Sequence, residues 1–315
     1  MLTRSAWFLF LFLFVPSLFA QTANRSIAIT IDDLPVVSTR RDIENRRTIT
    51  KKLLGHIRKA HVPAIGFVNE NKLYVGGRRD EQEIDLLRMW LNAGLELGNH
   101  TFSHRSLNTI PINDYQADVL KGESITRELL GARKKSIRYF RHPFLQTGRT
   151  LEIKAQFGKF LGDHGYTIAP VSFDNADYIF SRAYDNAFDK RDAALMKLVG
   201  DAYVPYMEAK LSYWERQSTK LFGREISQIL LIHANFINSD YFEDLASMFR
   251  KRGYRFVSLD QALKDEAYSL PDTYIGPAGI SWLHRWALEK GRAYVIPNEP
   301  RVPEFVLKAS GFESE

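Results

Sequence analysis

Two adjacent aspartates, Asp32 and Asp33, directly follow the apolar stretch SIAITI (26–31). Like charges repel each other, and a buried carboxylate without a partner is unfavourable, so the pattern predicts a positive group beside them. The histidines His100 and His104 of the stretch GNHTFSH are four residues apart, so one helical turn or a tight loop can direct both imidazoles to one point. Two histidines and one aspartate suit a divalent cation, most simply zinc, and leave a position open for water.

The composition excludes several other classes of site. None of the 315 residues is a cysteine, which excludes thiol catalysis, cysteine-ligated zinc and disulfides. The formal net charge is +6, and the densest basic run, residues 40–52, contains interspersed acidic residues, so nucleic-acid binding is not indicated. The hydrophobic content of 45% is that of a globular chain with a substantial core.

Residues 1–20, MLTRSAWFLFLFLFVPSLFA, are typical of a secretory signal peptide. They contain one basic residue, Arg4, an apolar run over 7–15 that is too short to cross a bilayer, and Ala20 before the expected cut. Leu18 is unusual at the third position before that cut, so an uncleaved membrane anchor is the alternative. We therefore expect an exported protein, periplasmic or extracellular, with no membrane span once this segment is removed.

The chemically capable residues must be positioned by the elements around them. Seven apolar runs alternate with helical patterns such as 46–60, 112–131 and 239–253, which favours parallel strands wrapped by helices in a barrel or an open sheet. The seven runs are 26–31, 64–69, 95–100, 137–142, 167–172, 229–234 and 254–259. In either architecture the carboxyl ends of the strands form one rim, where chemistry is usually located. The polar residues expected at this rim are Asp32, Asp33, His100, His104, Arg141, Asp174, Asp177 and His233.

In this order, the motifs TIDD, HTFSH, FRHPF, DNADY and ILLIH resemble those of the polysaccharide deacetylase family of carbohydrate esterases, also called the NodB-homology family. The resemblance covers about residues 26–259. It implies an α/β fold, a distorted (β/α) barrel of about seven parallel strands. It also implies a metal-dependent hydrolase that removes acetyl groups from N-acetylated sugars.

Matched residue by residue, the resemblance assigns the first two motifs to metal binding and to the catalytic base. The implied metal ligands are Asp33, His100 and His104, and the implied base is Asp32. A carboxylate bound to a metal is a poor base, whereas its unbound neighbour can take a proton from water. Arg141 is expected to pair with Asp32 and hold it ionised, and Asp177 is expected to position Arg141.

The last motif supplies the implied general acid, His233, because the leaving amine must gain a proton and imidazole can supply one near neutral pH. The backbone N–H of Phe144 is expected to stabilise the oxyanion. Three positions depart from the family pattern. His142 replaces a proline and either contacts substrate or packs, Tyr178 replaces a tryptophan in the wall that receives the acetyl methyl, and Ala234 removes one partner of His233.

The chain is expected to divide into a signal peptide (1–20), a catalytic domain (21–266) and a helical, proline-rich extension (267–315) that packs on the barrel. Within the catalytic domain, the stretch 178–228 is longer than a simple crossover and predicts a helical insertion. Aromatic residues at such spacing are more often core residues than a sugar-binding platform. The aromatic residues of the insertion considered for either role are Tyr203, Tyr206, Tyr213 and Trp214.

The expected cofactor is a divalent metal ion, most simply Zn²⁺, with Co²⁺ or Mn²⁺ as alternatives. The expected partner is an acetylated glycan or oligosaccharide, such as peptidoglycan, a chitin-like oligomer or an exopolysaccharide. Cleavage of O-acetyl esters is an alternative within the same chemistry. The other alternative is a non-catalytic glycan-binding protein on the same fold, against which the intact base, ligands and acid argue.

Overall fold

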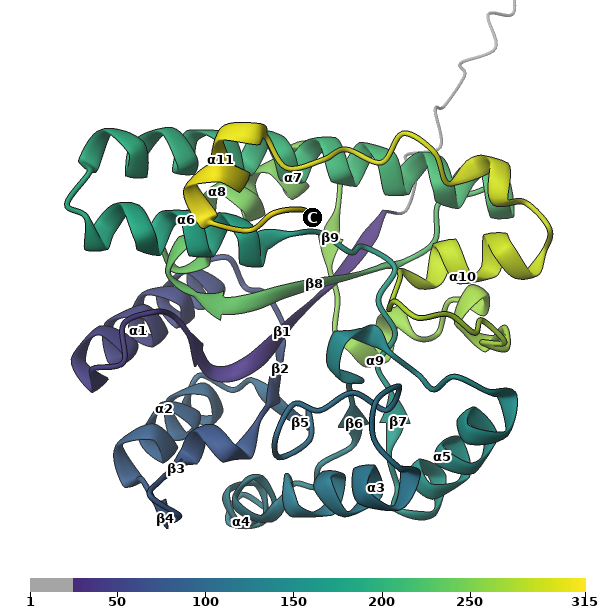
Figure 1. Ribbon diagram of the computed structural model, residues 1–315, viewed down its shortest axis with the longest axis horizontal. Coiled ribbons are helices and arrows are strands. Elements are labelled where there is room, and N and C mark those ends of the chain that lie inside the picture. The colour runs from purple at the N-terminus through teal and green to yellow at the C-terminus, as the bar shows by residue number, and fades with distance from the viewer. Residues whose placement is uncertain (1–24) are drawn as a thin grey trace, which may run out of the picture.

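The computed structural model describes residues 25–315, so the expected signal peptide over 1–20 lies outside the described residues. Figure 1 shows a curled sheet at the centre of the molecule with helices packed around it. Among residues 25–315, no helix combines the length and the apolar character needed to cross a membrane.

Seven parallel strands form the sheet in the order β7-β6-β5-β2-β1-β8, and β9 pairs with β1. Their bounds are β1 (Ser26–Val37), β2 (Ile65–Val68), β5 (Glu96–Asn99), β6 (Tyr139–Phe140), β7 (Thr167–Ile168), β8 (Gln228–Asn235) and β9 (Arg255–Phe256). The predicted fold, a distorted (β/α) barrel of about seven parallel strands, is confirmed. A separate antiparallel hairpin joins β3 (Tyr74–Val75) to β4 (Arg78–Arg79).

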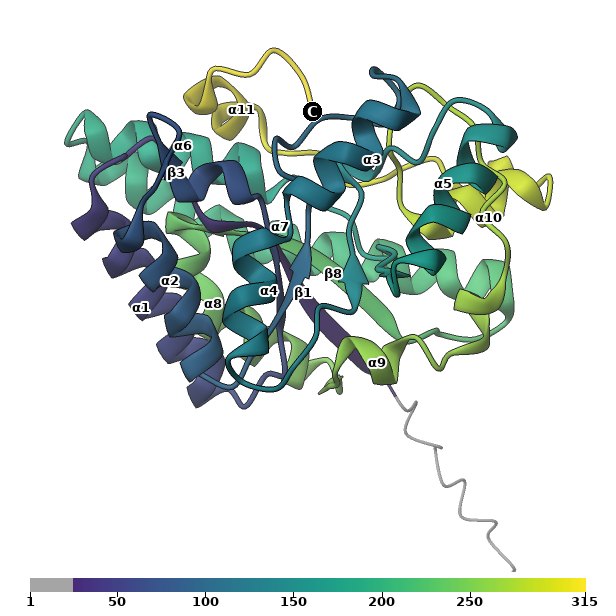
Figure 2. The same cartoon turned by 90° about the horizontal axis from the view of Figure 1, so that it is seen from below.

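Helices surround the sheet on its outer side (Figures 1 and 2). The α-helices are α1 (Ile43–Lys59), α2 (Glu81–Asn92), α3 (Ile112–Lys121), α4 (Ser124–Gly131), α5 (Leu151–Asp163), α6 (Asp177–Asp189), α7 (Ala193–Phe222), α8 (Phe236–Lys251), α9 (Leu259–Ala262), α10 (Trp282–Glu289) and α11 (Glu304–Ser310). Short 3-10 turns are η1 (Glu70–Leu73), η2 (Pro143–Leu145), η3 (Glu266–Ser269) and η4 (Ala293–Val295).

Three strands are shorter than the apolar runs predicted, since β6, β7 and β9 have two residues each. After β6 the chain enters a 3-10 turn at Pro143, and after β7 Pro170 has no N–H to donate to a neighbouring strand. After β9 the side chain of Ser258 accepts the backbone N–H of Gln261 and begins α9. Local turn and capping chemistry therefore ends these strands before their hydrophobic pattern does.

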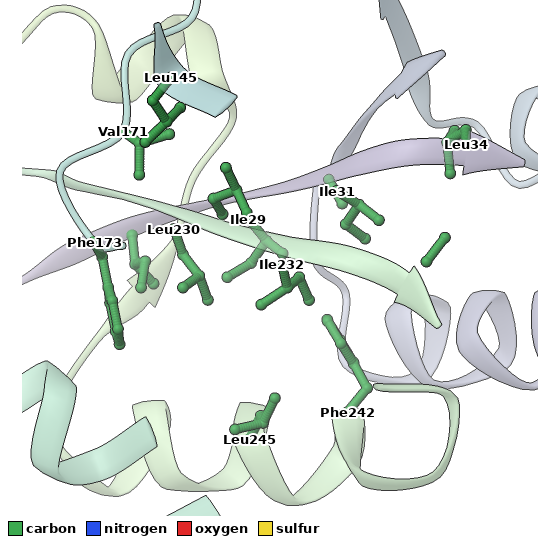
Figure 3. Close-up of a cluster of buried hydrophobic side chains, with 14 of the residues drawn as sticks. Ile29, Ile31, Leu34, Leu145, Val171, Phe173, Leu230, Ile232, Phe242 and Leu245 are labelled. Atoms are coloured by element: carbon green, nitrogen blue, oxygen red, sulfur yellow. The ribbon is translucent and has the colours of Figure 1, made fainter. Parts of the chain in front are cut away.

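The core is built by the alternation of side chains along β1. Ile27, Ile29 and Ile31 face the helices, and Figure 3 shows the last two packed with side chains of β8 above Phe242 and Leu245 of α8. The intervening residues Ala28, Thr30 and Asp32 face the inside of the barrel, because successive strand residues point to opposite faces. In a regular strand Asp33 would point away from the inside of the barrel, so it needs a different backbone conformation to lie on the same side as Asp32.

The stretch 178–228 contains most of α6 and all of α7, a 30-residue helix. Four of its aromatic residues are at most 5% exposed, so these four belong to the core, as their spacing predicts. These residues are Tyr203, Tyr206, Tyr213 and Trp214. In the stretch 267–315, α10 packs on α7 and α11 packs on α6. Figure 2 shows α11 and the chain end on the side to which β1 points, which is the side of the carboxyl rim.

Candidate active site

The two aspartates of β1 reach the same side because the strand is interrupted between them and Val37. Asp33 has φ 66°, a left-handed conformation, and the pairing of β1 with β8 shifts register after Asp32. A regular strand would point adjacent side chains to opposite faces, whereas this irregularity turns both carboxylates toward the barrel rim. Asp32 lies opposite His233 of β8 in the sheet.

Three side chains converge on one point at this rim. The carboxylate Oδ1 of Asp33 lies 3.3 Å from Nε2 of His104 and 3.5 Å from Nε2 of His100. One ligand atom from each residue lies within 4.8 Å of the other two. The histidines come from a tight loop rather than a helix, and His104 has a φ of 54° that directs its ring back toward His100.

The protonation states of these groups suit a cation. Nδ1 of His100 lies 2.8 Å from the backbone carbonyl of Arg141, so Nδ1 carries the proton and Nε2 presents a lone pair to Asp33. Burial lowers the pKa of His100 well below its usual value, which keeps the ring neutral. The buried Oδ1 of Asp33 has no hydrogen-bond partner among the described residues. The residues therefore fit a divalent metal ion by donor type and spacing.

Lys72 of η1 also contacts Asp33, which the sequence analysis did not anticipate. Its Nζ donates to the backbone carbonyl of Asp33 at 2.7 Å and lies 4.0 Å from the carboxylate. Burial alone raises the pKa of Asp33, but Lys72 and the two histidines outweigh burial and lower it below its usual value. The sequence did indicate where Lys72 would lie, because it follows the second predicted strand and is therefore placed at the same rim.

Asp32 pairs with Arg141, as expected from the resemblance. Nη1 of Arg141 lies 3.5 Å from Oδ2 of Asp32, and Nη2 donates to Oγ1 of Thr30 at 2.8 Å. Both members of the pair are buried, at 2% and 0% exposure. Burial raises the pKa of Asp32 to about 6, and Arg141 opposes that rise. Asp32 is thus a carboxylate with a pKa close to neutrality, as a general base requires.

Asp177 has a different partner from the one expected. It contacts His233 and not Arg141: its Oδ1 lies 2.7 Å from Nδ1 of His233, and its Oδ2 accepts the backbone N–H of His233 at 2.8 Å. Two further donors, Nδ2 of Asn238 at 2.7 Å and Nδ2 of Asn235 at 3.1 Å, hold the carboxylate. Asp177 contacts His233 because α6 begins at Asp177 and packs against β8, the strand that carries His233 near its end.

The Asp177 carboxylate also replaces the partner that Ala234 removes. Burial lowers the pKa of His233, but Asp177, with smaller contributions from Asp33 and Asp32, outweighs burial and raises it to about 9. His233 is therefore protonated at neutral pH and can donate a proton from Nε2. The hydroxyl of Tyr203, from α7, donates to Asn238 at 2.6 Å and supports this arrangement from the helical insertion.

The three residues expected at the substrate lie in different surroundings. Phe144 is 57% exposed with φ 56°, and its ring lies 4.5 Å from that of His104. Tyr178 is 40% exposed. His142 is only 2% exposed and packs between Phe140 and Phe157, with ring centroids at 5.0 and 5.4 Å. Since Arg141 points into the barrel, the next side chain points outward, which favours the packing alternative for His142.

A cavity of about 650 Å³ lies on this outer side, between α5, β7 and the segment after α9. His142, Lys154, Asp272 and Trp282 contribute to its lining, and none of the residues gathered at the rim does. The ammonium of Lys154 is paired with Asp272 at 2.8 Å. This cavity is therefore separate from the candidate active site.

One rim of the parallel barrel thus gathers Asp33 with two histidines, the carboxylate of Asp32 paired with Arg141, and the imidazole of His233 held by Asp177. Metal-assisted acyl hydrolysis uses side chains of these types. Residues 20–167 match the family model described as polysaccharide deacetylase. The 148 matched residues are somewhat less than half of the 315-residue chain, so the match shows a similarity to this family over that segment. The matched segment includes Asp32, the three ligand residues and Arg141, but it ends before Asp177 and His233, whose pairing comes from the structure.

Two curated relatives match the chain over part of its length. Peptidoglycan-N-acetylglucosamine deacetylase of Bacillus cereus is 27% identical over 152 residues, which cover 48% of this chain and 46% of the relative. Chitin deacetylase of Colletotrichum lindemuthianum is 28% identical over 152 residues, which cover 48% of this chain and 52% of the relative. The chain spans about half the length of the curated relatives it matches.

Solved structures agree with the fold. A mutant of a Bacillus anthracis pseudoenzyme of the CE4 family, described as having restored enzymatic activity, matches with a TM-score of 0.51 at 16% identity. The match covers 76% of this chain and 67% of that chain. Another mutant of the same pseudoenzyme matches with a TM-score of 0.50 at 15% identity, with the same coverage. At this identity the likeness concerns the barrel only.

Proposed function

We propose that the chain is an exported, divalent-metal-dependent hydrolase that removes acetyl groups from N-acetylated sugars of a glycan or oligosaccharide. The observation that carries the proposal is the convergence at one rim of the Asp33–His100–His104 set, the carboxylate of Asp32, which lies outside that set, and the Asp177–His233 pair. Peptidoglycan and chitin-like polymers are the first substrates to test, because the two curated relatives are named for them. Export rests on the composition of residues 1–20 and is tested by a mature terminus near Gln21.

In this proposal each group has one task. A divalent ion held by Asp33, His100 and His104 would polarise the acetyl carbonyl and make water more acidic. Asp32 takes a proton from the attacking water, and Arg141 keeps that carboxylate oriented. The backbone N–H of Phe144, beside His104, is the proposed hydrogen-bond donor to the oxyanion.

His233 completes the reaction by giving a proton to the leaving nitrogen. An amide nitrogen departs only after it is protonated, whereas an activated ester oxygen departs without a proton. The carboxylate of Asp177, which accepts from Nδ1, leaves Nε2 of His233 as the donor. An imidazole held protonated at neutral pH favours N-acetyl substrates over O-acetyl substrates.

The test is acetate release by the purified chain loaded with zinc, cobalt or manganese. The substrates are N-acetylglucosamine oligomers, a peptidoglycan fragment and an O-acetylated sugar, and Asp32→Asn serves as the matched inactive control. Acetate from the N-acetylated substrates supports the proposal. Acetate from the O-acetylated sugar alone would indicate an esterase. Binding of the oligomers without acetate from any substrate, with all three ions, would indicate a glycan-binding protein.

A further inference from the structure

Two exposed aromatic side chains meet beside the candidate active site, although they are far apart in the sequence. Tyr178 and Phe312 are each 40% exposed, and their ring centroids lie 5.7 Å apart at an interplanar angle of 80°. Tyr178 follows Asp177, the residue that holds His233. The backbone of Tyr178 is therefore adjacent to the residue that holds the proposed general acid.

Phe312 is placed by contacts of the segment that precedes it. The helix α11 ends at Gly311, whose φ of 80° turns the chain sharply toward Phe312. Nδ2 of Asn186, on α6, donates to the backbone carbonyls of Ala309 and Ser310 at 3.0 and 3.1 Å. Since α6 also carries Tyr178, one helix fixes both aromatic side chains relative to each other.

The segment after Phe312 is held as well. Oε1 of Glu315 lies 3.4 Å from Nζ of Lys210 and 3.3 Å from the hydroxyl of Tyr206, and Oε2 accepts the backbone N–H of Val302 at 2.8 Å. Lys210 is buried at 3% exposure and also pairs with Glu299 at 2.5 Å. Phe312 thus stands on a segment fixed on both sides, and its exposure is not that of a loose tail.

Two exposed aromatic rings that contact each other form an apolar surface that a ligand can cover. A sugar ring has apolar C–H faces that can cover an aromatic ring while its hydroxyl groups remain in water. The position next to His233 corresponds to the side from which the leaving amine of the sugar departs. These features point to a carbohydrate ring as the occupant.

We propose that Phe312 forms, with Tyr178, a stacking subsite for the sugar ring next to the one that loses its acetyl group. This inference rests on the proposed function and deepens it, because it predicts a preference for oligosaccharides over single sugars. Phe312 comes from the extension, outside the matched family segment, whereas Tyr178 comes from α6, so the extension supplies one of the two rings of this subsite.

The test compares Phe312→Ala with the parent, both as full-length, metal-loaded chains. Direct binding of the N-acetylglucosamine tetramer should weaken by roughly two- to tenfold, the usual size of one aromatic contact. The KM for the tetramer should rise by the same factor with kcat unchanged. Hydrolysis of 4-nitrophenyl acetate should not change, because this ester does not reach the subsite. Phe312→Trp should restore tetramer binding.

The matched control is Phe305→Ala, which removes a phenylalanine of the preceding helix α11 that is 36% exposed, and it should leave tetramer binding at the parent value. Equal tetramer binding by Phe312→Ala and the parent would overturn the subsite whether or not acetate is released. A parent that releases no acetate, but whose tetramer binding depends on Phe312, would overturn the proposed reaction and support the subsite.

Discussion

Replacement of Asp177 by asparagine is expected to disable the general acid while leaving the ligand set and the base in place. Asparagine has the size of aspartate, and its oxygen can still accept from the backbone N–H of His233 and the amide of Asn238. Its NH₂ group would then face Nδ1 of His233, where the carboxylate now accepts. That contact favours the tautomer with the proton on Nε2 and opposes the imidazolium ion.

The size of the effect follows from the pKa of His233. Burial lowers this pKa, and the Asp177 carboxylate outweighs burial and raises it from 6.5 to about 9. Without the carboxylate we expect a pKa of about 6.5 or below, a change of about 3 kcal/mol. At pH 8 the protonated fraction of His233 would fall from about nine tenths to about 3%, so amide hydrolysis should slow by roughly thirtyfold or more.

The assay is the pH profile of kcat/KM for an N-acetylated sugar between pH 5.5 and 10. The basic limb, which reports loss of the proton from His233, should move down from about pH 9 toward 6.5 in Asp177→Asn. An activated acetyl ester should be affected much less. Direct titration of His233 by NMR should be done on the metal-free protein, because a bound cation would itself lower this pKa.

Stability gives an independent readout with a defined sign. Because the pKa of His233 is higher in the folded state than in the unfolded state, the Asp177–His233 pair contributes stability that is fully present below about pH 6.5. This contribution is lost as the pH rises through about 9. The difference in unfolding free energy between the parent and Asp177→Asn should therefore shrink over this interval.

The control is Asp185→Asn, which removes another buried carboxylate from α6 whose partners are Ser38, Thr39 and Arg40. This variant can lose stability but should keep the basic limb near pH 9. The reasoning is refuted if Asp177→Asn shows the same basic limb and the same amide turnover as the parent. Loss of activity equal for amides and activated esters would also contradict the assignment of His233 as the acid.

The further predictions concern the metal ligands, the base and the arginine that pairs with the base. The chain should bind about one divalent ion, and His104→Ala should lose both the ion and acetate release; full metal content in that variant would contradict the ligand assignment. Asp32→Asn should keep the ion and the fold while kcat falls on the order of a hundred- to ten-thousandfold, and Asp33→Asn should lose the ion first, with activity partly recovered at high metal concentration. Burial raises the pKa of Asp32 to about 6 and Arg141 opposes the rise, so Arg141→Ala should move the acidic limb of the pH profile upward relative to the parent; an unchanged limb would show that the guanidinium does not act on the base.

The sequence by itself determined the fold class and most of the candidate site. Parallel strands that alternate with helices place their carboxyl ends at one rim, so polar residues following separate strands could be assigned to one region before any coordinates were known. The spacing of His100 and His104 and the adjacency of Asp32 and Asp33 predicted a ligand set that the structure brings within 4.8 Å. Both features involve residues that are close together in the chain, and such local patterns can be read directly from the sequence.

Only the tertiary structure decided which groups pair with each other. The contact between Asp177 and His233 depends on how α6 packs against β8, two elements separated by the whole of α7. Whether His142 faces the barrel or the helices depends on the direction of a two-residue strand, which its hydrophobic pattern does not specify. The place of Phe312 beside Tyr178 arises from contacts across more than a hundred residues of chain. Such contacts form because buried surface and paired charges lower the free energy of the whole fold, and residue order alone does not show which distant elements will meet.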